Sequence, residues 1–254
     1  MRSLLVMTLL CSPLALADVQ LKVEAHSLLR LPITSDSLQL ERLEIGANGT
    51  LLVPASLHEI RVTELVLGPG AYIGIAPGER AFRLEVMHGQ VNADSRLSVR
   101  GAPGTELKPP TTGRALSLRL ADASLAGLVL DARGGAGAPG FRGLDGAAGE
   151  AAGCTWGRSG QGHDGQAGSD GSAGAAGAQV RLEVPRDFPL DSFKVLLDGG
   201  PGGPAGAAGE AGPGGAGKGC LLYRAEGARA GRPGNPGQPG TAGPAGSLTV
   251  VHIE

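Results

Sequence analysis

The chain has 254 residues and a formal net charge of −2, with 45 glycines, 18 prolines and only seven aromatic residues (four Phe, two Tyr and one Trp). So few aromatic side chains leave little material for a conventional large core. The near-neutral charge provides no basic surface of the kind that nucleic acid or an anionic membrane requires, so we expect neither as a partner.

The first 17 residues have the pattern of a secretory signal peptide. Met1-Arg-Ser precedes an apolar run over 4–10, and small residues ending at Ala17 form a cleavage site. The run is too short to span a membrane. We therefore expect cleavage after Ala17, which removes Cys11. The mature chain would have no membrane span and would be periplasmic, on the cell surface or extracellular.

Residues 18–133 consist of short alternating strands separated by Gly-bearing corners. The clearest units are 43–54 and 65–77, and looser versions follow at a spacing of about 20 residues. Such recurrence is typical of a β-solenoid, in which each coil buries its inward residues against the next. An antiparallel sandwich of short strands is the alternative. Because the units resemble one another, we predict a β-solenoid-like domain over 18–133.

Glycine then recurs at every third residue in four blocks of equal length. Each block holds six glycines in this period within 16 residues: 134–149, 162–177, 200–215 and 231–246. A Gly-X-Y period with Ala and Pro is typical of a polyproline II helix, whose glycines form one bare stripe. Strand-like sequences at 179–184 and 193–197 would lie at the base of an up-and-down array. We therefore predict four antiparallel Gly-X-Y helices within 134–246, with a terminal strand over 247–254 returning to the base.

Runs such as Gly137-Ala-Pro-Gly-Phe-Arg-Gly143 and Gly231-Arg-Pro-Gly-Asn-Pro-Gly-Gln-Pro-Gly240 resemble bacterial collagen-like exported proteins. That resemblance implies a homotrimer of an extracellular matrix. However, each run stops after five triplets and the second block lacks proline, whereas a triple helix needs long uninterrupted repeats. The glycine-rich part is also similar to the polyglycine-II bundles of a phage adhesin tip and of the snow-flea antifreeze protein, which implies intramolecular packing.

The expected fold class is thus all-β plus polyproline or polyglycine II. It combines an N-terminal β-solenoid-like domain with an intramolecular bundle of four antiparallel Gly-X-Y helices. We expect a monomer, and the homotrimer is the alternative.

The two remaining cysteines have matching positions in the repeat. Cys154 lies five residues after Gly149, and Cys220 lies five residues after Gly215. The same offset beyond two outward blocks would bring both thiols to one tip. Because exported proteins fold in oxidising compartments, we predict a disulfide between Cys154 and Cys220.

Aromatic and basic side chains gather in the two loops at this tip. Loops held by a rigid scaffold commonly carry function, and aromatic and Arg residues are typical binding anchors. The candidate binding residues for an unidentified protein or glycan surface are Trp156, Arg158, Lys218, Tyr223, Arg224 and Arg229. The alternative is a plug, in which Trp156, Leu221, Leu222 and Tyr223 pack around the disulfide.

No catalytic, metal or cofactor motif stands out. His163, Asp164 and Asp170 faintly resemble the calcium repeats of β-roll toxins, but the apolar residue of that nonapeptide is missing. We therefore expect a secreted structural or adhesive module that is not an enzyme and binds no cofactor. Less favoured alternatives are a polysaccharide-active β-helix enzyme and an ice-binding protein. The latter would use an exposed polar row: Arg232, Asn235, Gln238 and Thr241.

Overall fold

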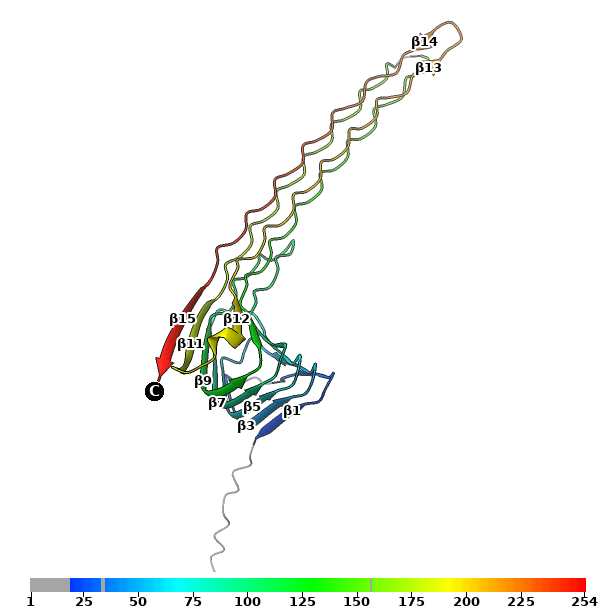
Figure 1. Ribbon diagram of the computed structural model, residues 1–254. Helices are drawn as coiled ribbons and strands as arrows, with labels where there is room; N and C mark the ends of the chain where they lie inside the picture. The colour runs from blue at the N-terminus through cyan, green and yellow to red at the C-terminus, as the bar shows by residue number, and fades with distance from the viewer. Residues whose placement is uncertain (1–18, 33–34, 156) are drawn as a thin grey trace, which may run out of the picture.

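The structure is a computed structural model that describes residues 19–32, 35–155 and 157–254. Two large parallel sheets dominate it (Figure 1). The seven-stranded sheet contains, in spatial order, β1 (Gln20–Val23), β3 (Ser37–Ile45), β5 (Glu59–Leu67), β7 (Phe82–Val91), β9 (Leu116–Leu125), β11 (Gln179–Pro185) and β15 (Ser247–Ile253). The six-stranded sheet contains β2 (Leu28–Arg30), β4 (Thr50–Val53), β6 (Tyr72–Ile75), β8 (Ser95–Ser98), β10 (Leu128–Asp131) and β12 (Phe193–Leu196). We call the two sheets together the parallel stack.

Consecutive strands alternate between the two sheets as far as β12, so each turn of the chain adds one strand to each sheet. Gln20 pairs with Arg42 and Ser37 with Glu59, a step of 22 residues. This register places Leu43 beside Leu65, and both side chains are buried in the shared core. Alternation along each strand thus points one set of side chains between the sheets and the other set outward.

The first turns of the stack share a left-handed backbone position at one corner. His26, Asn48 and Asp94 have φ values of 57°, 53° and 60°, and Gly70 has a φ of 68°. The corners are bonded to one another: the Asn48 N–H donates to the Pro69 carbonyl, and the Gly70 N–H donates to the Ala93 carbonyl. A left-handed residue reverses the chain within a short connection, and Asn, Asp and Gly tolerate this conformation best.

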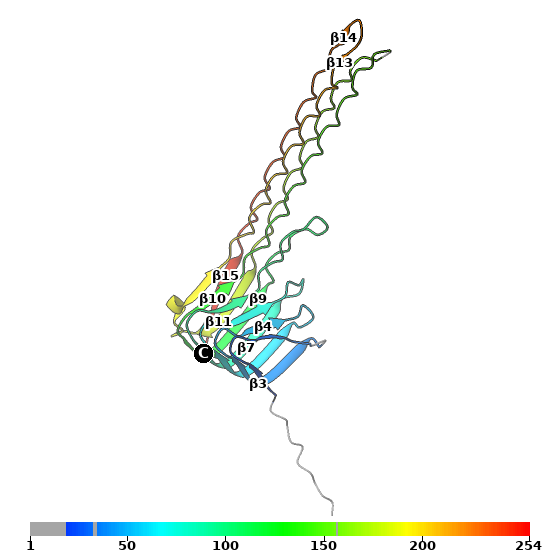
Figure 2. The ribbon, with the colours of Figure 1, turned by 90° about the vertical axis from the view of Figure 1, so that its right-hand side faces the viewer.

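Long insertions interrupt the later turns without disturbing the register. Phe82 on β7 still pairs with Leu116 on β9, and Gln179 on β11 pairs with Ser247 on β15. Two long connections leave the stack, one between β10 and β11 and the other between β12 and β15. Together they form one long projection that we call the glycine-rich arm (Figures 1 and 2).

Four extended glycine-rich segments are joined to one another along the arm by backbone hydrogen bonds. Glycines of 134–149 donate to carbonyls of 200–215, as Gly137 does to Pro201 at 2.9 Å. Glycines of 200–215 donate in turn to 162–177, and those of 231–246 donate back to 200–215. A Cβ at Gly203 would collide with the Ala138 carbonyl oxygen, so a side chain there would block the close approach of the two segments.

The fold class expected from the sequence is wrong. It rested on a bundle of four Gly-X-Y helices, whereas the only helical element in the described ranges is the 3₁₀ turn η1 (Leu190–Ser192). Parallel β-sheet supplies most of the regular structure instead. The physical reason is that the alternating apolar strands bury one face between two sheets and so form the regular structure, whereas the glycine-rich segments are extended and donate hydrogen bonds to one another.

Two sequence predictions fall on residues that lie outside the described ranges. These are the signal peptide, residues 1–17, and Trp156. Within the described ranges, no helix is both long and apolar enough to cross a bilayer.

Candidate binding site at the tip of the arm

The far end of the arm carries a small antiparallel hairpin made of β13 (Lys218–Gly219) and β14 (Arg224–Ala225) (Figure 1). Lys218 pairs with Ala225, and the Cys220 N–H donates to the Tyr223 carbonyl at 2.8 Å. Two residues, Leu221 and Leu222, are left to form the turn. The hairpin therefore places two leucines at its apex.

The predicted disulfide is confirmed. Cys154 and Cys220 are bonded across a sequence separation of 66 residues, with their Cα atoms 5.7 Å apart. The Tyr223 hydroxyl donates to the Cys154 carbonyl at 2.6 Å, and the Ser159 hydroxyl donates to the Glu226 carbonyl at 2.7 Å. These three links hold the two tip loops, 150–161 and 216–230, against each other.

The apex leucines are unusual for their position. Leu221 is 100% exposed and Leu222 is 93% exposed. Turns normally use Gly, Asn, Asp or Ser, which suit the backbone and are well solvated. Leucine neither favours a turn conformation nor is well solvated, and these two leucines contribute nothing to the core. Large apolar side chains displayed together in this way are a common mark of an interaction surface.

Three of the predicted binding residues lie together beside the hairpin. Arg158, Tyr223 and Arg224 line one open hollow of about 490 Å³, which also includes Ser159 and Glu226. The two guanidinium groups provide planar donors, and the tyrosine ring provides an apolar wall. Such a surface is suited to a polar ligand that carries acceptor groups.

The other predicted residues are more dispersed. Lys218 is exposed on β13, one residue from the strand end. Arg229 is exposed near the end of the tip loop 216–230, where its carbonyl accepts from the Gly162 N–H, and it does not line the hollow. Ser159 and Glu226 were not predicted from the sequence, because a single Ser and a single Glu in irregular loops give no periodic signal.

The aspartates of the second glycine-rich segment have a structural role. Asp164 accepts from the Arg232 N–H at 2.7 Å, and Asp170 accepts from the Gln238 N–H at 2.6 Å. Each therefore satisfies a backbone donor of the last segment. No group of three or more potential metal-ligating side chains occurs among the residues that the structure describes.

No family model, curated protein or solved structure matches this chain. Its function therefore has to be inferred from the side chains of the tip and from how the arm holds them.

Proposed function

We propose that this chain is a secreted, non-enzymatic structural or adhesive module that presents its disulfide-linked tip to a protein or glycan surface. The observation that carries the proposal is the exposed Leu221-Leu222 apex on a hairpin that is otherwise firmly fixed. The disulfide also supports export, because such bonds persist mainly in oxidising compartments.

The ordered hairpin lowers the conformational-entropy cost of binding a partner. A loop that is already ordered loses little conformational entropy when a partner docks, so more of the contact energy appears as affinity. Burying one leucine side chain is worth about 1.5–3 kcal/mol. Two leucines with Tyr223 beside them form an apolar anchor, and Arg158 and Arg224 supply charge around it.

The plug alternative requires the apolar tip residues to pack around the disulfide. Leu221 and Leu222 extend into solvent instead, and Tyr223 is about half exposed while its hydroxyl bonds to the Cys154 carbonyl. These exposures favour a surface that meets a partner. A contribution of Trp156 to this surface is part of the proposal.

The test compares binding and stability on the same variants. The probe is an array of immobilised glycans and extracellular-matrix proteins, and the variants are Leu221→Ser with Leu222→Ser, Tyr223→Ala, Arg224→Ala and Trp156→Ala. Truncating a binding hot spot commonly costs at least about 2 kcal/mol, so we expect roughly thirtyfold weaker capture. The leucine pair should show this loss with an unchanged melting temperature, because neither leucine supports the fold.

The matched control is Leu107→Ser, which changes an equally exposed leucine on another loop. It should bind like the wild type. If the tip variants also bind like the wild type, or lose binding only in proportion to lost folding, the tip is a structural cap and the proposal is wrong.

A further inference from the structure

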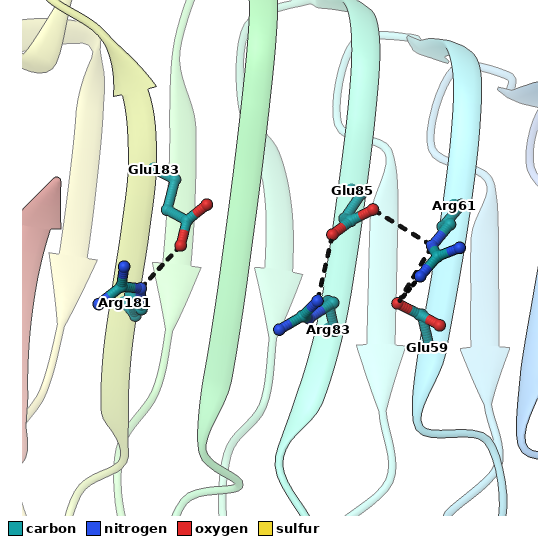
Figure 3. A network of polar contacts seen from close by, with 6 residues as sticks. All are labelled: Glu59, Arg61, Arg83, Glu85, Arg181 and Glu183. Carbon is teal, nitrogen blue, oxygen red and sulfur yellow. Dashed lines mark hydrogen bonds and ion pairs between the residues drawn. The ribbon is translucent and has the colours of Figure 1, made fainter. Parts of the chain in front are cut away.

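The outward faces of the two sheets differ in how their arginines are partnered. On the seven-stranded sheet, Arg61 lies between Glu59 and Glu85, at 2.9 and 3.2 Å, and Arg181 pairs with Glu183 at 2.7 Å (Figure 3). The Arg61–Glu85 pair joins β5 to β7, and the other two pairs each join residues of one strand.

At the six-stranded sheet, three exposed arginines have no carboxylate at ion-pair distance among the described residues. Arg30 lies on β2, Arg96 lies on β8, and Arg100 lies two residues beyond the end of β8. The nearby carboxylate of Asp131 is already engaged, because it accepts from both Nε and Nη2 of Arg133 at 2.9 and 2.8 Å. This face of the stack therefore carries unpaired positive charge.

Two of these arginines border a hollow of about 550 Å³, which we call the Tyr72 groove. Arg30, Leu52, Gly74 and Ser98 stand side by side on β2, β4, β6 and β8. The absence of a side chain at Gly74 leaves room for neighbouring side chains to lie over the centre of this row. Arg30 and Arg100 both line the groove, whereas Arg96 does not.

Tyr72 forms one wall of the groove. It lies two residues before Gly74 on the same face, and a Cβ added to Gly74 would come within 2.8 Å of the Tyr72 ring and 3.1 Å of the Leu52 side chain. The ring and the leucine therefore make a continuous apolar surface over the glycine. Pro54 and Pro77 extend it.

We propose that the Tyr72 groove binds an acidic polysaccharide, with a sugar ring against Tyr72 and sugar carboxylates on Arg30 and Arg100. An arginine fork matches the geometry of a carboxylate. An aromatic ring beside an apolar floor suits the apolar face of a pyranose. The volume lies in the range of small-ligand sites.

The spacing of the arginines favours a polymer over a small anion. Strands β2 and β8 are three steps apart, which is about 14 Å at the usual strand spacing. A chain with a carboxylate on each sugar offers a separate acceptor to each arginine, whereas a single small acid offers its acceptors at one place only. A single-stranded nucleic acid would need a series of aromatic platforms, and among the described residues Tyr72 is the only aromatic one that lines the groove.

The test is calorimetric titration of the full chain with a short oligogalacturonate. Arg30→Gln and Arg100→Gln should each weaken binding about tenfold or more, because each removes a charge-assisted hydrogen bond. Arg96→Gln is the matched control on the same face and should stay within about twofold of the wild type. Tyr223→Ala, at the tip, should also leave this binding unchanged, which separates the groove from the proposed function of the arm.

Three results would overturn the inference. One is an absence of oligogalacturonate binding by the folded wild-type protein. Another is equal binding of a fully methyl-esterified oligomer, which lacks the charges. The third is tighter binding of a short single-stranded DNA through the same two arginines, which would make the groove a general polyanion surface.

Discussion

At the scale of single residues, the most consequential side chain of the stack is Arg114. It is only 1% exposed, and its guanidinium donates to the carbonyls of Arg80, Ala76 and Leu57 at 2.9, 3.2 and 2.9 Å. It also lies 5.3 Å from the centre of the Phe82 ring. One side chain therefore satisfies backbone carbonyls of two connections, the one between β4 and β5 and the one between β6 and β7.

Replacing this arginine should destabilise the stack strongly. In Arg114→Met, buried carbonyls lose their donor, and each unsatisfied group costs about 1–3 kcal/mol, so we expect a total loss of about 3 kcal/mol or more in urea unfolding. Arg119→Met, on the exposed face of β9, should change the free energy of unfolding by no more than about 0.5 kcal/mol. Similar losses in both variants would show that Arg114 has no special role.

His58 makes the stability of this region depend on pH. Its Nδ1 lies 2.8 Å from Nη2 of Arg114 and must accept, since a guanidinium only donates, so the ring is neutral. Desolvation lowers the pKa of His58 below 6.5, the positive charges of Arg80 and Arg114 lower it further, and Asp36 opposes them. Because the pKa is lower in the folded state than in the unfolded state, stability is full above about pH 6.5 and declines as the pH falls below it.

The check is the pH dependence of unfolding in His58→Asn, whose amide oxygen can accept the same hydrogen bond. The slope of stability between about pH 7 and pH 5 should be shallower than in the wild type. An unchanged slope, or a wild-type protein that gains stability on acidification through the His58 transition, would contradict the assignment.

At the scale of elements, sequence patterns predict features that depend on residues close together in the chain. They miss features that depend on contacts between residues far apart in the chain. The equal offsets of Cys154 and Cys220 correctly predict the disulfide. The glycine period predicts a close approach between segments, but it does not reveal how much of the regular structure the two parallel sheets supply, which is why the predicted fold class failed. The Tyr72 groove was also missed, because it depends on the register of β2, β4, β6 and β8.

The close, hydrogen-bonded approach of the arm segments makes the glycines of the arm intolerant of substitution. Gly203→Ala should weaken the arm by about 1–3 kcal/mol, because the added Cβ meets the backbone of Ala138 and overpacking carries costs of this size. Amide exchange along 134–149 and 200–215 would report the change. Gln238→Leu, whose side chain is exposed, should leave exchange unaltered. If the two variants behave alike, the glycine contacts do not hold the arm together.

The disulfide should matter most at the tip. In the double variant Cys154→Ser and Cys220→Ser, we expect faster amide exchange in 150–161 and 216–230 and normal protection in β3, β5 and β7. In the chain-entropy model a bond that closes a loop of 66 residues is worth about 4 kcal/mol against global unfolding. Loss of protection in the stack strands ahead of the tip loops would show that the bond supports the whole fold instead.

At the scale of the whole molecule, the parallel stack serves as the base and the glycine-rich arm as an extension. The two long connections that form the arm do not interrupt the sheet. Strand β9 still pairs with β11, and β11 still pairs with β15. Each glycine-rich segment has 16 residues and spans at most about 55 Å when fully extended. All four segments come from one chain and bond to one another, so the arm needs no second copy to satisfy its glycine donors.

The most direct test of this account is the mass and shape of the protein in solution, measured by light scattering and small-angle X-ray scattering on the same sample. We predict particles with the mass of one chain, at most 25.3 kDa, and a strongly elongated profile of a compact base with a thin extension. A particle of three chains, with a cooperative collagen-like melting of the glycine-rich part, would contradict the self-contained arm and favour the trimeric alternative.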